Sequence, residues 1–239
     1  MFADASPTIL SSPRATPLLD SEPGFAKPFS LLHIADLLEL SAIQALFAGV
    51  PRDPYVEAGF RHKSLFRARV AGRKVVVTEH APLYQPVEFN PIHGGIRRHY
   101  PAMDAALATL LHPLVNLFAG CSGLGPQDEV LVQAQRITAR EGQTGFPVVE
   151  GWHQDDIKVL GLLLINRGNV SGGISLLSHD RGANLAFSRQ LAPGDLLLID
   201  DRVMWHNTTP ITQVDPTQLG FRDIVIITSP TNRPPAPEA

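Results

Sequence analysis

Apolar and polar residues alternate along short segments in the second half of the chain. In residues 129–138, one face carries Gln133 and Gln135 between apolar neighbours, and the other face is mostly apolar. Because successive side chains of a strand point to opposite faces, this pattern predicts a strand with a polar strip on one side. Further short strands are expected at residues 159–165, 173–178, 184–190, 195–200, 203–207 and 222–228.

Helical spacing of apolar residues marks the first half of the chain. It predicts an amphipathic helix, or a broken helix pair, in residues 30–48, where Gly49 and Pro51 supply the stop. A second helix is expected in residues 102–119, closed by Gly120. Between them, residues 64–70 and 73–78 predict a β-hairpin.

Helices followed by many short strands favour a mainly β domain with flanking helices. The expected architecture is a double-stranded β-helix, a cupin-like jelly roll. A chain of 239 residues with 44% hydrophobic residues is large enough for one buried core. We expect that domain to span residues 29–229, between a disordered, proline-rich arm at 1–28 and a proline-rich tail at 230–239.

Charge and cysteine content argue against several classes of function. A net charge of -3 with scattered basic residues indicates neither a nucleic-acid partner nor a membrane partner. No signal peptide is seen, and no apolar run approaches the ~18 residues of a membrane helix. Cys121 is the only cysteine, so an intrachain disulfide is excluded and a cytoplasmic location is expected. The expected partner is a small molecule, and a homodimer is one candidate for the oligomeric state.

Residues 84–101 are too rich in proline and glycine for regular structure and predict a shaped loop. The backbone at Gly94 and Gly95 can approach a ligand closely, because neither residue has a side chain. Arg98, with Arg97 as the alternate, is the candidate for binding a substrate carboxylate. The alternative is a structural loop whose arginines face water.

His153 and Asp155 lie two positions apart in a segment that leads into the apolar residues 159–165. In a strand they would point the same way and grip one ion, whereas Asp156 would point away. His206, beside another apolar strand, offers a third ligand. Two histidines and one carboxylate on one face are typical of non-haem Fe(II) sites. For any one histidine alone, a structural role remains the alternative.

Arg222 opens the last predicted strand, where it offers a planar fork to a carboxylate. An ion pair with Asp223 or Asp201 is the alternative. Beside an iron site, Arg222 would anchor an acidic cosubstrate. Gln133 and Gln135 are further candidates for hydrogen bonds to cosubstrate or substrate, unless they only satisfy neighbouring strands.

Six blocks of the sequence follow one another in a recognisable order: residues 84–85, 90–95, 150–155, 166–173, 198–211 and 222–223. With these blocks, the sequence resembles the 2-oxoglutarate- and Fe(II)-dependent dioxygenases of the bacterial free amino-acid hydroxylase type, which include the L-isoleucine 4-hydroxylases. The resemblance runs from residue 61 to residue 228.

The resemblance implies that His153, Asp155 and His206 bind Fe(II) and that Arg222 holds the distal carboxylate of 2-oxoglutarate. Gln135 and Thr208 would be further cosubstrate contacts. It implies an enzyme that uses O2, is stimulated by ascorbate and releases succinate and CO2. The reaction would hydroxylate an aliphatic carbon of a free or N-acylated L-amino acid, recognised through Gly94, Gly95 and Arg98.

Asp156 marks a departure from these relatives, which carry glycine there, and we expect the difference to bear on substrate choice. A related halogenase would need a small residue in place of Asp155. Two other readings stay open at this point: a non-catalytic jelly roll that binds a small molecule, and a cupin-type metalloenzyme that does not use 2-oxoglutarate. The sequence also leaves open the carbon attacked and the choice among hydroxylation, sulfoxidation and desaturation.

Overall fold

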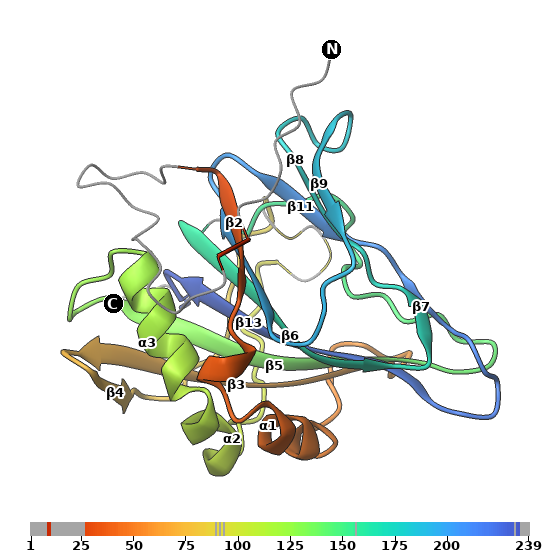
Figure 1. Ribbon diagram of the computed structural model, residues 1–239, viewed down its shortest axis with the longest axis horizontal. Coiled ribbons are helices and arrows are strands. Elements are labelled where there is room, and N and C mark those ends of the chain that lie inside the picture. Colours follow the sequence, from red (N-terminus) through yellow and green to blue (C-terminus); the bar gives the residue numbers. More distant parts are fainter. Residues whose placement is uncertain are drawn as a thin grey trace.

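The computed structural model describes residues 9–10, 27–88, 90, 92, 94–155, 157–231 and 233–234. A large sheet crosses the centre of the molecule, with helices on one face and smaller sheets over the other (Figure 1). Alternating side chains along the central strands serve both faces, which is why those strands are apolar almost throughout.

The large sheet has eight strands within the described residues, and all pair antiparallel except the first two. Their spatial order is β1 (Ile9–Leu10), β2 (Phe29–His33), β10 (Asp195–Asp200), β6 (Val159–Gly168), β13 (Gly220–Ser229), β5 (Glu129–Ala139), β3 (Arg61–Ala71) and β4 (Lys74–Val77). One smaller sheet joins β11 (Trp205–Thr208), β8 (Ser175–Ser178) and β9 (Leu185–Arg189). Another pairs β12 (Ile211–Gln213) with β7 (Val170–Gly172).

Helices cover the outer face of the large sheet. They are the short 3-10 helix η1 (Ala35–Leu37), α1 (Leu40–Phe47), α2 (Ala105–Leu110) and α3 (His112–Cys121). Phe47 and Phe118 are fully buried in the cluster that joins these helices to Val132 of β5 and Leu163 of β6. A second apolar cluster joins the inner face to the small sheet through Leu177 and adjoining residues. No helix in the described part of the chain has the length and apolar character needed to cross a bilayer.

The predicted jelly roll is confirmed, and each strand predicted for residues 159–165, 195–200 and 222–228 forms close to its expected limits. The hairpin is also present as β3 and β4. β7 and β12 were not predicted, and β6 continues to Gly168, three residues beyond the predicted limit at residue 165.

The helix predicted for residues 30–48 is wrong in its first part. Phe29–His33 forms strand β2, which pairs antiparallel with β10 in the large sheet. The apolar pattern of this segment fits either structure, and pairing with β10 buries Leu31 and Leu32 on opposite faces. The helix predicted for residues 102–119 is interrupted at Leu111, because Pro113 lacks an amide proton and starts a new helix.

The domain limits stay predictions. Residues 1–8 and 11–26 of the predicted arm lie outside the described residues, while Ile9–Leu10 pairs with β2. At the other end, Thr231 and Arg233 donate hydrogen bonds of 3.0 and 2.8 Å to the carboxylate of Glu129. The start of the predicted tail is therefore held against β5.

Candidate active site

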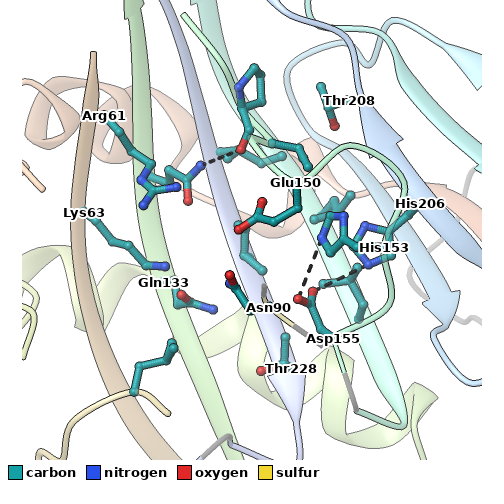
Figure 2. A pocket seen from close by; sticks show the side chains of 18 of the residues that line it. Arg61, Lys63, Asn90, Gln133, Glu150, His153, Asp155, His206, Thr208 and Thr228 are labelled. Atoms are coloured by element: carbon teal, nitrogen blue, oxygen red, sulfur yellow. Dashed lines mark hydrogen bonds and ion pairs between the residues drawn. The ribbon is translucent and has the colours of Figure 1, made fainter. Parts of the chain in front are cut away.

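A cavity lies between the inner face of the large sheet and the small sheet that contains β11. Strands β3, β5, β6 and β13 form one wall, and the segments around residues 85–98 and 147–155 form another. Polar side chains from β3, β5, β13 and both of these segments line it, whereas β6 contributes Leu160 and Leu162 (Figure 2). The polar strip predicted on β5 is part of this lining, through Gln133 and Gln135.

The cavity brings His153, Asp155 and His206 together. One ligand atom from each lies within 4.8 Å of the others, so the three can converge on a single ion. Asp155 Oδ1 lies 3.7 Å from His153 Nε2, and Asp155 Oδ2 lies 3.5 Å from His206 Nε2 (Figure 2). The segment is not the regular strand we expected. It forms one isolated bridge, in which the main chains of His153 and His206 exchange hydrogen bonds.

The hydrogen bond of His153 leaves one of its ring nitrogens free for a metal. His153 Nδ1 donates to the carbonyl oxygen of Gly151 at 2.9 Å, which leaves Nε2 unprotonated, 3.7 Å from Asp155 Oδ1. Burial lowers the pKa of His153, and the charge of His206 lowers it further. His153 is therefore neutral at physiological pH, as a metal ligand must be.

Asp155 is charged and His206 is protonated in the absence of a metal. Burial acts to raise the pKa of Asp155, but His153, His206 and Gln85 together hold it well below its ordinary value. Burial acts to lower the pKa of His206, but the carboxylates of Asp155 and Asp201 raise it to about 10. A cation between these groups would take the place of that proton.

Gln85 and Asp201 both contact residues of the triad. Gln85 Nε2 donates a 2.9 Å hydrogen bond to Asp155 Oδ1. Asp201 accepts a 2.7 Å hydrogen bond from the main-chain NH of Asp155, and its other oxygen lies 3.0 Å from His206 Nε2. Outer contacts of this kind orient metal ligands. Sequence reasoning considered Asp201 only as a partner for Arg222, and the structure places it against the histidine.

Arg222 projects from β13 into the same cavity, where its side chain is almost fully buried. Its Nε and Nη2 atoms have no hydrogen-bond partner among the described residues. Burial lowers the pKa of Arg222 to about 10, Arg167 adds to the effect and Asp223 opposes it, so the group is still charged at neutral pH. Asp223 instead forms a two-point ion pair with Arg136. A buried guanidinium without a partner is costly, and a carboxylate ligand would satisfy it.

The other predicted contacts are only partly brought together. Gln135 and Thr208 line the cavity, and Gln135 Nε2 donates to the carbonyl of Pro147 at 3.4 Å. Arg98 also lines it and donates a 2.6 Å hydrogen bond to Gln85 Oε1. Gly94 and Gly95 do not line it. Their amides bond to the carbonyls of Asn90 and Gln85, so they shape the loop instead.

Three charged residues of the cavity were missed by sequence reasoning. Arg61 and Lys63 enter from β3, and Glu150 enters from the segment before His153 (Figure 2). Arg61 and Lys63 alternate along the strand, which was a usable signal, but nothing in the sequence shows that β3 lies next to β5. Asp156 lies outside the described residues, so its predicted role is untested.

The donor set fits an Fe(II) and 2-oxoglutarate site. Two imidazoles, which bind metals in their neutral form, and one carboxylate suit Fe(II). A buried arginine with two nitrogens that lack a partner among the described residues suits a dicarboxylate. The family model for 2OG-Fe dioxygenases matches residues 44–228 of the sequence. The chain belongs to this family. The dioxygenase family uses Fe(II), 2-oxoglutarate and O2, and the predicted cofactors are confirmed at that level.

Solved structures share the fold of this dioxygenase. A bsmA homolog from Methylobium petroleophilum PM1 aligns with a TM-score of 0.72 and 24% identity over 89% of this chain and 92% of that chain. IDO from Bacillus thuringiensis aligns with a TM-score of 0.67 and 16% identity, covering 85% and 93% of the two chains. The Fe(II)/(alpha)ketoglutarate-dependent dioxygenase TqaL aligns at 0.59 with 17% identity, covering 87% and 83%. No curated protein matches the sequence.

Proposed function

We propose that this dioxygenase hydroxylates an aliphatic carbon of a free or N-acylated L-amino acid and releases succinate and CO2. His153, Asp155 and His206 are the proposed iron ligands, and Arg222 is the proposed anchor for the distal carboxylate of 2-oxoglutarate. The observation that carries the proposal is the buried guanidinium of Arg222, whose Nε and Nη2 have no partner in the described part of the chain, in the same cavity as the triad.

Hydrogen bonds within the protein set the protonation and the orientation of the proposed iron ligands. His153 keeps its Nδ1 proton on the Gly151 carbonyl and offers Nε2, while His206 gives up a proton when a metal binds. Gln85 and Asp201 fix the position of Asp155. When bound, Fe(II) supplies the redox chemistry that couples decarboxylation of 2-oxoglutarate to oxidation of a substrate carbon.

The walls of the cavity support an amino-acid substrate. Leu160, Leu162 and Ile226 give an apolar surface on the large sheet, suited to an aliphatic side chain. Lys63 and Arg98 give a basic surface that suits a carboxylate. This combination favours an amino acid over a neutral hydrocarbon or a highly charged metabolite.

The two alternative functions, a cupin-type metalloenzyme and a non-catalytic binding protein, each leave one feature of the cavity unexplained. A cupin-type metalloenzyme that does not use 2-oxoglutarate gives Arg222 no carboxylate partner. A non-catalytic binding protein gives no reason for two histidines and a carboxylate to converge within 4.8 Å. The cytoplasmic location, small-molecule partner and homodimer stay predictions.

A mass-spectrometric screen tests the proposal. Purified protein is incubated with Fe(II), ascorbate, 2-oxoglutarate and a panel of free and N-acylated L-amino acids, and both succinate and products heavier by one oxygen atom are measured. We expect at least one panel member to stimulate succinate formation and gain an oxygen. Folded His153→Ala and Asp155→Ala variants should lose both signals. Normal turnover in either variant, or no response to the whole panel, would contradict the proposal.

A further inference from the structure

Lys63 is a buried cation that faces the cavity, and no carboxylate of the described residues pairs with it. Only 8% of the residue is exposed, and its Nζ lies over the ring of Tyr100, 4.7 Å from the ring centroid. Burial, together with the charges of Arg61 and Arg98, lowers the pKa of Lys63 to about 7, although Asp53 and Asp155 act to raise it. An anion bound beside Nζ would offset this cost.

Arg61 extends the basic surface along β3. Its Nε donates a 2.6 Å hydrogen bond to Asp53, which neutralises its charge, but its Nη2 is buried and has no partner among the described residues. Arg61 and Lys63 are two positions apart on one strand and point into the cavity from the side opposite the triad (Figure 2). Together they present donors that are unused within the described part of the protein.

Glu150 brings a negative charge into the same space. Its side chain lies between the β3 cations and His153 (Figure 2). Its Oε2 accepts a 3.2 Å hydrogen bond from the main-chain NH of Val149. Arg61 forms its ion pair with Asp53 and not with Glu150. The cavity is therefore lined both by Glu150 and by the two β3 cations, Arg61 and Lys63, which do not pair with it in the described structure.

Opposite charges that share a cavity without pairing are suited to a ligand that carries both signs. In an α-amino acid the carboxylate and the ammonium group are attached to the same carbon, next to an apolar side chain. The β3 cations match the carboxylate, Glu150 matches the ammonium, and the apolar surface of β6 matches the side chain.

We propose that Glu150 binds the free α-ammonium group of the substrate while Lys63, assisted by Arg61 Nη2, binds its α-carboxylate. This inference rests on the proposed function and narrows it to amino acids whose amine is free. An N-acylated substrate would remove the positive charge and leave Glu150 unpaired in the cavity, which is unfavourable.

Anaerobic calorimetry tests this assignment without turnover. Protein loaded with Fe(II) and 2-oxoglutarate is titrated with L-isoleucine, L-leucine, L-valine and L-methionine, with the N-acetyl form of each, and with the matching amine that lacks the carboxylate. The free amino acid that binds best should bind about tenfold to a hundredfold more tightly than its N-acetyl and amine forms.

Two variants separate the two ends of the ligand. Glu150→Gln should weaken the free amino acid about tenfold or more and leave its N-acetyl form unchanged, whereas Lys63→Met should weaken both forms that carry a carboxylate. Exposed Glu141→Gln and Lys74→Met are the matched controls. Retained binding of 2-oxoglutarate shows that each variant is folded.

Three results would overturn the assignment: equal or tighter binding of an N-acetyl form, a free-to-acetyl ratio that survives Glu150→Gln, or no binding by any panel member. None of these results decides the proposed function, which the product screen tests separately. Hydroxylation of an N-acylated amino acid in that screen would support the broader function and reject the role of Glu150.

Discussion

Asp201 holds the backbone of Asp155 in place, because its Oδ2 accepts a 2.7 Å hydrogen bond from the Asp155 main-chain NH. The other oxygen of this 1%-exposed residue lies 3.0 Å from Nε2 of His206. One carboxylate therefore contacts two of the three proposed iron ligands, although it is not itself one of the triad.

Replacing Asp201 should weaken metal binding. We expect Asp201→Ala to lower Fe(II) affinity about tenfold to a hundredfold, since outer contacts set the orientation of metal ligands. Asp201→Asn keeps an oxygen acceptor for the Asp155 amide and should lose less. Anaerobic Fe(II) titration against a competing chelator measures this. Asp128→Ala removes a similar carboxylate-to-amide bond at an exposed turn and should bind iron normally.

Arg222→Gln should weaken 2-oxoglutarate binding about a hundredfold, because it removes a charged two-point contact from a buried site. Fe(II) affinity should change little. The stability of the ligand-free variant should not fall, since Nε and Nη2 of Arg222 have no partner to lose among the described residues. Calorimetry and thermal melting give these values. Exposed Arg69→Gln is the control, and an unchanged affinity for 2-oxoglutarate in Arg222→Gln would reject the anchor role.

Gly173→Ala should disturb the same anchor indirectly. A Cβ at this position would lie 3.0 Å from Cδ of Arg222 and 3.1 Å from Cγ2 of Ile211. Gly72→Ala is a matched control, because its φ of +66° is close to the +69° of Gly173 and a Cβ there meets nothing within 4 Å. Both should lose about 1–2 kcal/mol of stability to backbone strain. Only Gly173→Ala should also raise the dissociation constant for 2-oxoglutarate, and equal constants would contradict the contact.

Lys63→Met should stabilise the ligand-free protein, and the gain should depend on pH. The folded-state pKa of Lys63 is about 7, below its ordinary value of 10.5, because burial disfavours the charge. The stability associated with this group is therefore fully present above pH 10.5 and is lost as pH falls through about 7. Urea unfolding should show the largest gain for Lys63→Met below about pH 7 and a shrinking gain toward pH 10.5. A gain that grows with pH would contradict this account.

Sequence patterns identified the parts of the fold that local periodicity controls. β5 is visible in the sequence through its strip of polar residues, and β6, β10 and β13 through their apolar runs. β2 was missed because FSLLH fits both a helix and a strand, and the decision depends on pairing with residues more than a hundred positions away. Local propensity contains no information about that partner.

The site was predictable to the extent that its residues carry a spacing or a block. His153, Asp155 and Arg222 became candidates in this way, His206 was added as a third ligand, and the structure brings all four to one cavity. Arg61, Lys63 and Glu150 were not, because their roles depend on the spatial order of β13, β5 and β3. Gly94 and Gly95 were expected at a ligand because glycine permits close approach, but here it permits a tight loop backbone.

Gln85 links the predicted substrate contact Arg98 to the proposed iron ligand Asp155. Its side chain donates a hydrogen bond to Asp155 and accepts one from Arg98. The loop that carries Arg98 is thus fastened to a proposed iron ligand. Grafting this loop from a relative to change substrate preference would also replace an outer partner of the metal centre. The iron content of such chimaeras should be measured as well as their products. Activity can be lost either because the substrate contact at Arg98 changes or because Asp155 loses its hydrogen bond from Gln85.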